Sequence, residues 1–538
     1  MTPRRQRRAG LPALAVLAAV LVAALGVGLG LVALGGLGRE VPLSGGHVRE
    51  ALVVDGPLTL VPAFAETPNS RDVSGLLYRG LTRSGADGKP VGELAKDWTV
   101  DAGAKTFTFH LRKGLRWSDG APLTSSDVLY TMSVLQSDAD AKSATGQAWA
   151  GISATAPDGV TIVYSLPQSS AAFLALTSIG ILPEHSLKPR AVKTLRQVTD
   201  APTSGPFVVA HAFKDHIDLA RNNHAFEKPY LDTMELRLYD SRDRAVQALV
   251  DGEVDVFGAM TAAEAKRVAQ SMNRRVVAGS TFAYAELLFN QKNALLADDH
   301  VRKALGLAVD RKTLVDHVLA GYARTDESPV PPAISWAALS TKTPALDLNA
   351  AGRELDAAGW KKQGQYRVQD GKRLTLRLAT ADADPYTSVA AAIRSDLARL
   401  GITTTTQSRS PEALLNLLES RQFDMALTAV DNGPDPDMYV FWHSSQAGPG
   451  GFNFSGMPKN DDLDKELETG RSTPDYAARR KAYLDAQKAI LADNAGLFLY
   501  TPQSLVGARD AVKGISLPAG GARYDLVQGW YVNTRHKL

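Results

Sequence analysis

Three strands and two helices alternate over residues 374–430, and this alternation constrains the fold of the chain more than any other feature. The segments 374–380, 402–408 and 423–429 have the composition of strands, whereas 386–400 and 411–421 have helical spacing. Strands that are joined by single helices imply right-handed crossovers and a parallel sheet. The sequence therefore predicts an α/β fold.

The loop AVDNGPDPD follows the third of these strands. Its two prolines exclude regular secondary structure. Its three carboxylates, Asp431, Asp435 and Asp437, could bind calcium, shape the turn or contact a ligand, but the EF-hand template with its terminal glutamate is absent. Ligands of parallel sheets bind beyond the carboxyl ends of the strands. Asp431 is therefore the expected ligand contact, and the other two acids are expected to orient the turn or to cap the segment after it.

The N-terminal end combines a basic arm, residues 1–8, with an uncharged segment, residues 9–38. A membrane helix needs about 20 apolar residues, whereas the core of a signal peptide has about 7 to 15. The length of the segment predicts a transmembrane signal anchor that leaves the binding domain outside the cytoplasm, with residues 39–47 as a linker. A cleaved signal peptide, which would give a secreted or periplasmic protein, is the alternative.

Composition and motifs exclude several classes of function. The chain has 538 residues and a net charge of +3, or −1 once the four arginines of the basic arm are subtracted, which argues against nucleic acid as a partner. There is no cysteine, so disulfides and thiolate metal sites are excluded. Because no nucleophile elbow, phosphate-binding loop or dinucleotide fingerprint is present, we expect neither an enzyme nor a cofactor. The ten histidines include no metal-binding motif.

Two further segments carry clear local signals. The run TFTFHL, residues 106–111, alternates strictly and predicts a strand of a hairpin with Phe107 and Phe109 on its buried face. Thr261 and Glu264 have the spacing of a capping box and predict the start of a helix.

Seven stretches in one order resemble the family 5 extracellular solute-binding proteins of peptide-type ABC importers, the group that takes up dipeptides, oligopeptides and nickel. The resemblance extends from about residue 50 to the C-terminus. The stretches are 92–128, 204–207, 217–232, 248–257, 287–311, 354–360 and 430–437.

The resemblance implies a two-lobed, periplasmic-binding-protein-like fold that closes around a ligand. The first lobe would comprise residues 48–285, with an extra subdomain at about 81–200, and would be completed by 505–538. The second lobe would comprise 286–504. Two strands that cross near Leu288 and Leu499 would form the hinge.

The resemblance also assigns binding residues. Dipeptide-binding members are similar at DNGDPD, where the leading aspartate pairs with the α-amino group of the ligand, and this position is Asp431 here. The sequence DNGPDPD contains an inserted Pro434, and residues 379–388 lack the arginine that holds a ligand carboxylate. The expected ligand is thus an amine-bearing peptide or another cationic small solute, rather than a free dipeptide specifically.

The remaining candidate ligand residues are chosen by position. Several aromatic residues follow the loop, and we expect most of them to pack in the protein core. Trp442 is the best candidate among them for a ligand contact. The other candidates are Tyr439, Asn432, Phe64, Gly205 and Tyr284.

The sequence is compatible with two functions from different classes. The first is a monomeric, membrane-tethered binding protein that delivers a peptide-like solute to ABC permease subunits, which are powered by a separate ATPase. The second is a ligand-sensing or scaffold protein with the same fold and no transport role.

Overall fold

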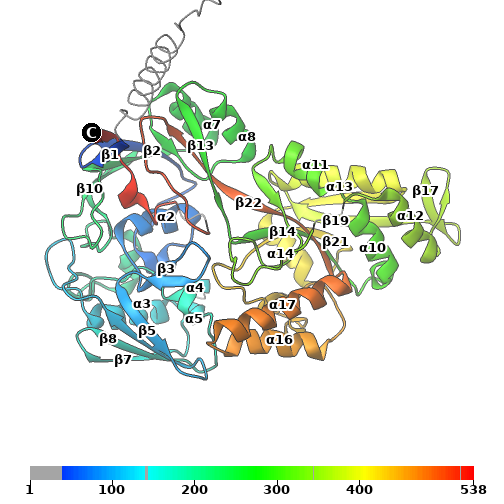
Figure 1. Cartoon of the computed structure of the whole chain (residues 1–538), viewed down its shortest axis with the longest axis horizontal. Helices are drawn as coiled ribbons and strands as arrows, with labels where there is room; N and C mark the ends of the chain where they lie inside the picture. The colour runs from blue at the N-terminus through cyan, green and yellow to red at the C-terminus, as the bar shows by residue number, and fades with distance from the viewer. Residues whose placement is uncertain (1–38, 140–142, 343–344, 521–522, 538) are drawn as a thin grey trace, which may run out of the picture.

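The computed structural model describes residues 39–139, 143–342, 345–520 and 523–537, which form two lobes joined by long strands (Figure 1). The predicted basic arm and signal anchor, residues 1–38, lie outside the described residues. Within the described ranges, no helix is both long enough and apolar enough to span a bilayer.

Lobe II contains the predicted alternating unit. Its strands β19, β20 and β21 lie in the order β20-β19-β21, and β19 is parallel to both neighbours, as the sequence predicts. The Ser410 hydroxyl accepts a hydrogen bond from the Ala413 N–H and caps the second helix. The elements of this unit are β19 (Thr375–Ala381), α13 (Tyr386–Leu400), β20 (Thr403–Arg409), α14 (Pro411–Glu419) and β21 (Met425–Asp431).

Strand β14 (Ala283–Phe289) extends this sheet and separates two hydrophobic clusters, because its side chains alternate between the faces. Leu287 and Phe289 pack in one cluster, whereas Tyr284 and Leu288 pack in the other. The remaining elements of lobe II are α9 (Ala294–Ala297), α10 (Asp299–Ala308), α11 (Arg311–Thr313), β15 (Ala323–Thr325), α12 (Leu348–Ala357), β16 (Lys361–Gln363), β17 (Tyr366–Gln369), β18 (Lys372–Arg373), α15 (Tyr439–Trp442), α16 (Asp461–Ser472) and α17 (Tyr476–Asp493).

Two antiparallel strand passages connect the lobes. The long strand β22 (Gly496–Arg509) pairs with β14 in lobe II and with β13 (Arg274–Ser280) in lobe I. The chain crosses between the lobes at residues 281–282 and 501–502, where the Thr281 hydroxyl donates a hydrogen bond to the Pro502 carbonyl at 2.6 Å. Leu288 and Leu499, where the sequence predicts the hinge, lie within the cores of lobe II.

Lobe I contains the predicted hairpin in a four-stranded sheet of order β5-β6-β8-β7. Strand β6 (Thr106–Leu111) buries Phe107 and Phe109 completely, which confirms the alternation read from the sequence. The other elements of lobe I are β2 (His47–Val53), α2 (Pro68–Leu77), β3 (Thr82–Ser84), β4 (Pro90–Gly92), β5 (Ala95–Val100), α3 (Ser125–Ala139), α4 (Ala144–Ala148), β7 (Ser153–Asp158), β8 (Thr161–Ser165), α5 (Phe173–Leu176), α6 (Glu184–Leu187), β9 (Phe207–Ala212), β10 (His216–Arg221), β11 (Thr233–Tyr239), α7 (Arg242–Asp251), β12 (Val256–Phe257) and α8 (Ala262–Ala269).

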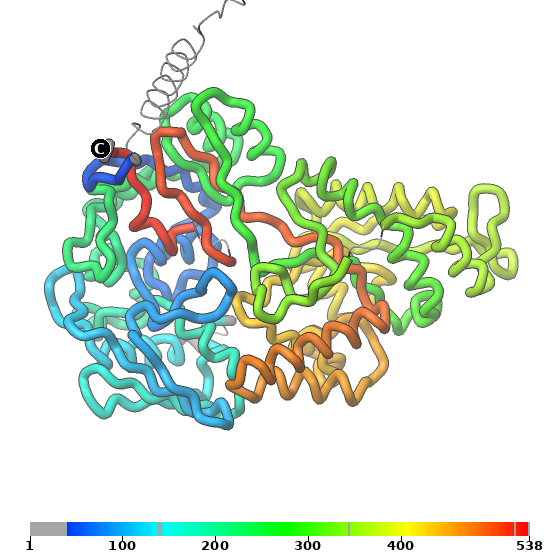
Figure 2. Tube along the Cα trace, in the orientation of Figure 1, coloured from blue at the N-terminus to red at the C-terminus, as the bar shows by residue number. Residues whose placement is uncertain are grey.

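The C-terminal segment returns to lobe I. Strand β23 (Asn533–Lys537) pairs antiparallel with β1 (Arg39–Leu43), so the first and last described strands lie side by side at one corner of the lobe (Figure 2). Further inside, the buried Arg523 guanidinium forms ion pairs with Glu50 at 3.1 Å and Asp72 at 3.0 Å. The segment thereby helps to complete the core of lobe I.

The start of α8 offers a direct test of a predicted helix signal. Thr261 accepts a hydrogen bond from the Glu264 N–H, and the Glu264 carboxylate accepts one from the Thr261 N–H at 2.7 Å. We expect Thr261→Ala to lower the free energy of unfolding by about 1 kcal/mol in a urea titration, because one helix N–H loses its partner. Thr261→Ser, which keeps the hydroxyl, should retain most of the stability. Equal stability of the alanine and wild-type proteins would contradict the cap.

Candidate functional site

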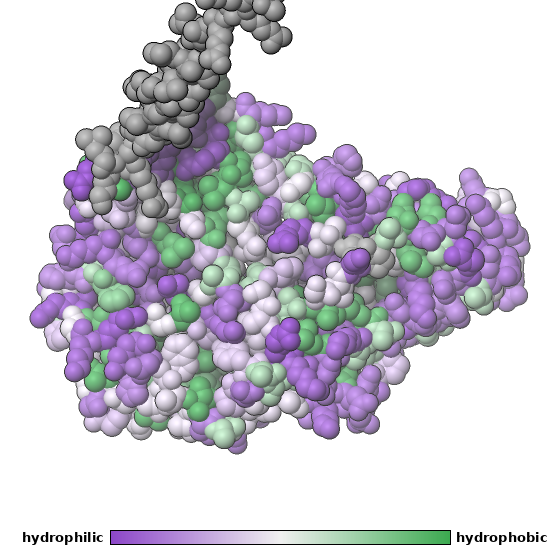
Figure 3. Space-filling model, viewed as in Figure 1, coloured by the Kyte–Doolittle hydropathy of each residue, from purple (hydrophilic) through white to green (hydrophobic). Residues whose placement is uncertain are grey.

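Two large cavities lie along the side of lobe I that faces lobe II. One has a volume of about 720 Å³ and is lined by β3 and β4 of lobe I, by residues 516–519, and by Ser280, Pro332 and Ala333 near the hinge. The other, about 600 Å³, is lined by residues of α2 and by most residues of the segments 78–84 and 175–180. Arg83 and Ser84 line both. In Figure 3, hydrophilic side chains dominate the outer rims of both lobes, and paler residues gather where the lobes meet.

The wall of lobe I presents charges of both signs. The Glu93 carboxylate pairs with Arg83 at 2.9 Å and with Arg79 at 3.4 Å. Asp525 lines the same cavity, and burial raises the pKa of its carboxyl group to about 6, with Arg79 opposing the rise. This group of charged residues was not predicted, because it assembles segments that are far apart in the sequence.

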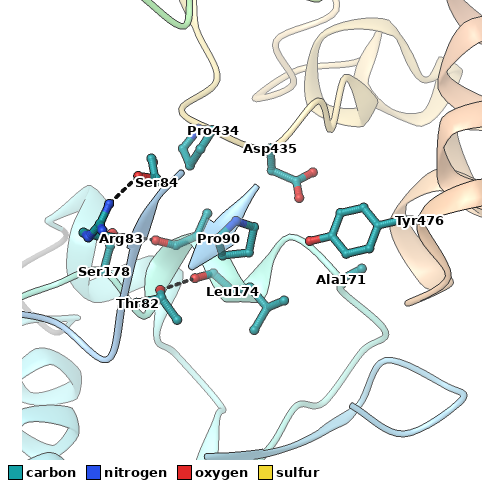
Figure 4. A pocket seen from close by; sticks show the side chains of 11 residues that line it. Thr82, Arg83, Ser84, Pro90, Ala171, Leu174, Ser178, Pro434, Asp435 and Tyr476 are labelled. Atoms are coloured by element: carbon teal, nitrogen blue, oxygen red, sulfur yellow. Dashed lines mark hydrogen bonds between the residues drawn. The ribbon is translucent and has the colours of Figure 1, made fainter. Parts of the chain in front are cut away.

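The lobes also touch at the end of the cleft that lies away from the hinge. Figure 4 shows Thr82, Ser84 and Pro90 of lobe I opposite Pro434, Asp435 and Tyr476 of lobe II, around a small pocket of about 10 Å³. Nearby, the Ala171 N–H donates a hydrogen bond to the Arg471 carbonyl at 2.8 Å. The cleft therefore lies between the hinge strands and this second contact.

The segment 429–437 begins as strand, because β21 continues to Asp431, and only the residues after Asp431 form the loop. The three carboxylates of the segment have different partners. Both carboxylate oxygens of Asp435 accept hydrogen bonds from Arg479, at 2.7 and 2.8 Å. Asp437 pairs with Arg471 at 2.7 Å and accepts a hydrogen bond from the Tyr439 N–H. Asp431, by contrast, is exposed and has no ion-pair partner among the described residues; its Oδ1 accepts a hydrogen bond from the Gly433 N–H at 2.8 Å.

The position of Asp431 is determined by the sheet. It is the last residue of β21 and pairs with Ala283, the first residue of β14, which directly follows the passage between the lobes. The carboxylate thus lies at the carboxyl end of a strand that is parallel to β19, beside the hinge, where the sequence predicts it.

The aromatic residues after the loop mainly pack against neighbouring side chains of lobe II. Trp442 is 2% exposed and lies against Phe498. Tyr439 is half-buried between the Arg471 guanidinium, 4.0 Å from its ring, and the His443 ring, whose centroid is 4.1 Å away. Asn432 is half-buried next to Asp431.

The other three candidate ligand residues are buried. Phe64 is 3% exposed in the core of lobe I, and Tyr284 is fully buried in lobe II. Gly205 packs against the end of α2, where an added Cβ would lie 2.6 Å from the Leu76 carbonyl oxygen. Packing alone accounts for these three positions, and their role in ligand binding stays a prediction.

Metal binding by the loop receives no support from the geometry. Among the described residues, no group of three or more histidine, aspartate or glutamate side chains is arranged to hold a metal ion.

Comparisons with known proteins match this architecture. The sequence model of the bacterial extracellular solute-binding proteins, family 5 (middle region), matches residues 89–452. The chain belongs to this family. Its members are binding proteins, and the chain accordingly binds a solute outside the cytoplasm and delivers it to a membrane permease.

Individual relatives share most of the chain. Protein XP55 of Streptomyces lividans is 30% identical, covering 83% of this chain and 82% of the relative. The oligopeptide-binding protein AppA of Bacillus subtilis is 27% identical and covers 88% of this chain and 90% of the relative. The structure of AppA with a nonapeptide superposes with a TM-score of 0.70, at 25% identity, over 92% of this chain and 100% of that one. NikZ of Campylobacter jejuni with Ni(L-His), at 22% identity, has the same fold, with a TM-score of 0.71 over 90% of this chain and 99% of that one.

The partners of Asp435 predict a structural role for this residue. Burial raises the pKa of the Asp435 carboxyl group, and Arg479 opposes the rise. Arg479→Met should lower the free energy of unfolding by about 3 to 5 kcal/mol, because the variant leaves a buried carboxylate without its cation. The exposed pair of Arg244 and Asp240 is a control, and Arg244→Met should cost less than about 1 kcal/mol. Similar urea midpoints for the two variants would contradict this role.

Proposed function

We propose that the protein captures an amine-bearing peptide or peptide-like solute between its lobes, with the Asp431 carboxylate as the partner of the amine. The observation that carries this proposal is the division of the loop carboxylates. Arg479 and Arg471 pair with Asp435 and Asp437, whereas Asp431 is exposed beside the hinge without a cation among the described residues. It is the carboxylate of this loop that remains available to a ligand.

The chemistry supports this assignment. A charge-assisted hydrogen bond between a carboxylate and an ammonium group is roughly twice as strong as a neutral one. Closure of the lobes removes water from the pair and strengthens it further. Because the pair of carboxylate and ammonium is stronger in the closed cleft than in the open one, a bound ligand favours closure of the lobes.

The charged residues along the wall of lobe I support the proposal that the solute carries both a positive and a negative charge. Arg79, Arg83, Glu93 and Asp525 place two cations and two carboxyl groups along the 600 Å³ cavity. Glu93 already pairs with both arginines. With Asp431 as the partner of the amine, the two guanidinium groups of this wall are the candidate partners of the carboxylate at the other end of a peptide.

The relatives support a peptide-like ligand and a transport role. AppA is named for binding oligopeptides, and a relative from Escherichia coli, DdpA, is named as a probable D,D-dipeptide-binding protein. Several Brucella relatives are named as putative ABC transporter peptide-binding proteins. We infer that the present protein binds as a monomer and hands its solute to ABC permease subunits whose ATPase is a separate chain.

Substitution of Asp431 tests the amine contact. With Ala-Ala-Ala as the ligand, Asp431→Asn should weaken affinity by about 10- to 100-fold in calorimetry, because one charge-assisted hydrogen bond is lost. Thermal stability should be unchanged, since Asp431 is exposed. Asp370→Asn, in the exposed turn between β17 and β18, is the matched control and should bind as the wild type does.

The ligand provides a second control. N-acetyl-Ala-Ala-Ala lacks the charged amine and should bind the wild type and Asp431→Asn equally. If the variant keeps full affinity for the free peptide, Asp431 does not hold the amine.

We also propose that residues 9–38 anchor the protein in the membrane, on the strength of their length and the basic arm that precedes them. The protein should then sediment with membranes and retain an N-terminus that includes residues 1–38. If Edman sequencing shows that the mature protein begins after residue 30, the membrane anchor is ruled out.

A further inference from the structure

Lobe II contains an apolar pocket that the proposed contact at Asp431 does not use. The lobe II pocket has a volume of about 390 Å³ and lies between one face of β14 and β21, helix α14, and the aromatic residues of 441–454. This volume is within the range of small-molecule sites, roughly 300–1,000 Å³. Leu415 and Phe452 line the pocket and are 39% and 42% exposed, so apolar side chains lie where the pocket reaches the surface.

A single carboxyl group lines this apolar pocket. Glu286 points from the middle of β14 and is only 4% exposed. Its Oε1 accepts a hydrogen bond from the Thr428 hydroxyl at 3.3 Å, while Oε2 has no hydrogen-bond partner among the described residues.

Such a carboxyl group is costly unless something pairs with it. A buried polar group without a partner loses its hydration, and a buried charge without a counterion loses far more. No lysine, arginine or histidine forms an ion pair with Glu286 among the residues that the structure describes. Burial accordingly raises the pKa of Glu286 to about 8, so at neutral pH the empty pocket holds the carboxyl mainly in its protonated form.

We propose that the lobe II pocket binds an apolar group that ends in a primary amine, with the Glu286 carboxylate as the partner of the ammonium and the aliphatic and aromatic walls around its stem. This inference deepens the proposed function and rests on it, since it assigns such a group to the captured solute. An alkyl ammonium ion fits because its carbon stem can pack against the apolar walls and its ammonium group can form a charge-assisted hydrogen bond with Glu286.

The proton balance of this step is defined. The ammonium ion arrives charged, the Glu286 carboxyl group gives its proton to the buffer, and the resulting carboxylate pairs with the ammonium. Binding therefore releases close to one proton per ligand at pH 7, and affinity rises with pH until the carboxyl group of the empty pocket is itself ionised near pH 8.

The other titratable groups around Glu286 do not account for such a dependence. Tyr284 and Tyr386 stay neutral, because burial raises the pKa of each phenol. His443, next to Trp442, pairs with Glu468 and Asp464 on α16. The further acid that interacts with Tyr284 is Asp326, whose pKa burial raises to about 6 and whose carboxylate accepts a hydrogen bond from Thr501. Asp326 does not line the lobe II pocket and is not among the groups that shift the pKa of Glu286.

The probes are n-hexylamine and its neutral counterpart n-hexanol, with dissociation constants measured by saturation-transfer NMR. The wild type should bind the amine at least tenfold more tightly than the alcohol at pH 8. As the ionised fraction of Glu286 falls, this preference should drop about fivefold from pH 8 to pH 7 and about tenfold from pH 7 to pH 6. Glu286→Gln keeps the size of the side chain, removes its charge, and should abolish both the preference and its pH dependence. Glu419→Gln, on the solvent side of α14, is the matched control and should keep both.

A calorimetric measurement tests the proposal without any variant. Titration of hexylamine at pH 7 in two buffers of different ionisation enthalpy should show release of close to one proton. Equal affinity for the amine and the alcohol, absence of proton release, or a preference that persists in Glu286→Gln would each overturn the proposal.

Failure of this proposal is distinguishable from failure at Asp431. Hexylamine has no peptide group, and every residue that lines its pocket belongs to lobe II. If Asp431→Asn leaves the affinity for Ala-Ala-Ala unchanged, the cleft contact is wrong and the hexylamine result is unaffected. If Glu286→Gln leaves the preference for hexylamine unchanged, the pocket assignment is wrong and the Ala-Ala-Ala result is unaffected.

Discussion

Backbone pairing along β22 is the interaction on which the rest of the structure depends. One strand of 14 residues shares its hydrogen bonds between β13 in lobe I and β14 in lobe II, and thus connects two separately packed cores. The passages at residues 281–282 and 501–502 are short and antiparallel, so they permit rotation of the lobes while keeping their edges in register. Because β21 pairs with β14, its carboxyl end lies beside the passage between the lobes.

The loop 429–437 shows how identical side chains acquire different roles from their surroundings. Asp435 and Asp437 are held by arginines from α17 and α16, which fixes the loop against these two helices. The loop is therefore rigid behind the exposed Asp431. Preorganisation of this kind lowers the conformational-entropy cost of ligand binding.

Sequence reasoning predicts the local and short-range features of this chain well. The alternation over residues 374–430, the cap at Thr261, and the placement of Asp431 at the end of β21 all depend on neighbours in sequence. Arg479 lies 44 positions from Asp435, and Arg83 meets Asp525 only after the C-terminal segment has returned to lobe I. Such partners are set by tertiary packing, which periodicity does not report. Glu286 did carry a signal, because a single charged residue interrupts the apolar strand FAYAELLFN.

The pairing of β1 with β23 has a mechanical consequence. Both ends of the described chain are held on lobe I, at the corner where these two strands meet. Any tether attached through the N-terminus therefore holds lobe I in place and leaves lobe II as the part that swings. Closure then amounts to lobe II moving onto a stationary lobe I, with Asp431 and the Glu286 pocket both carried by the moving part.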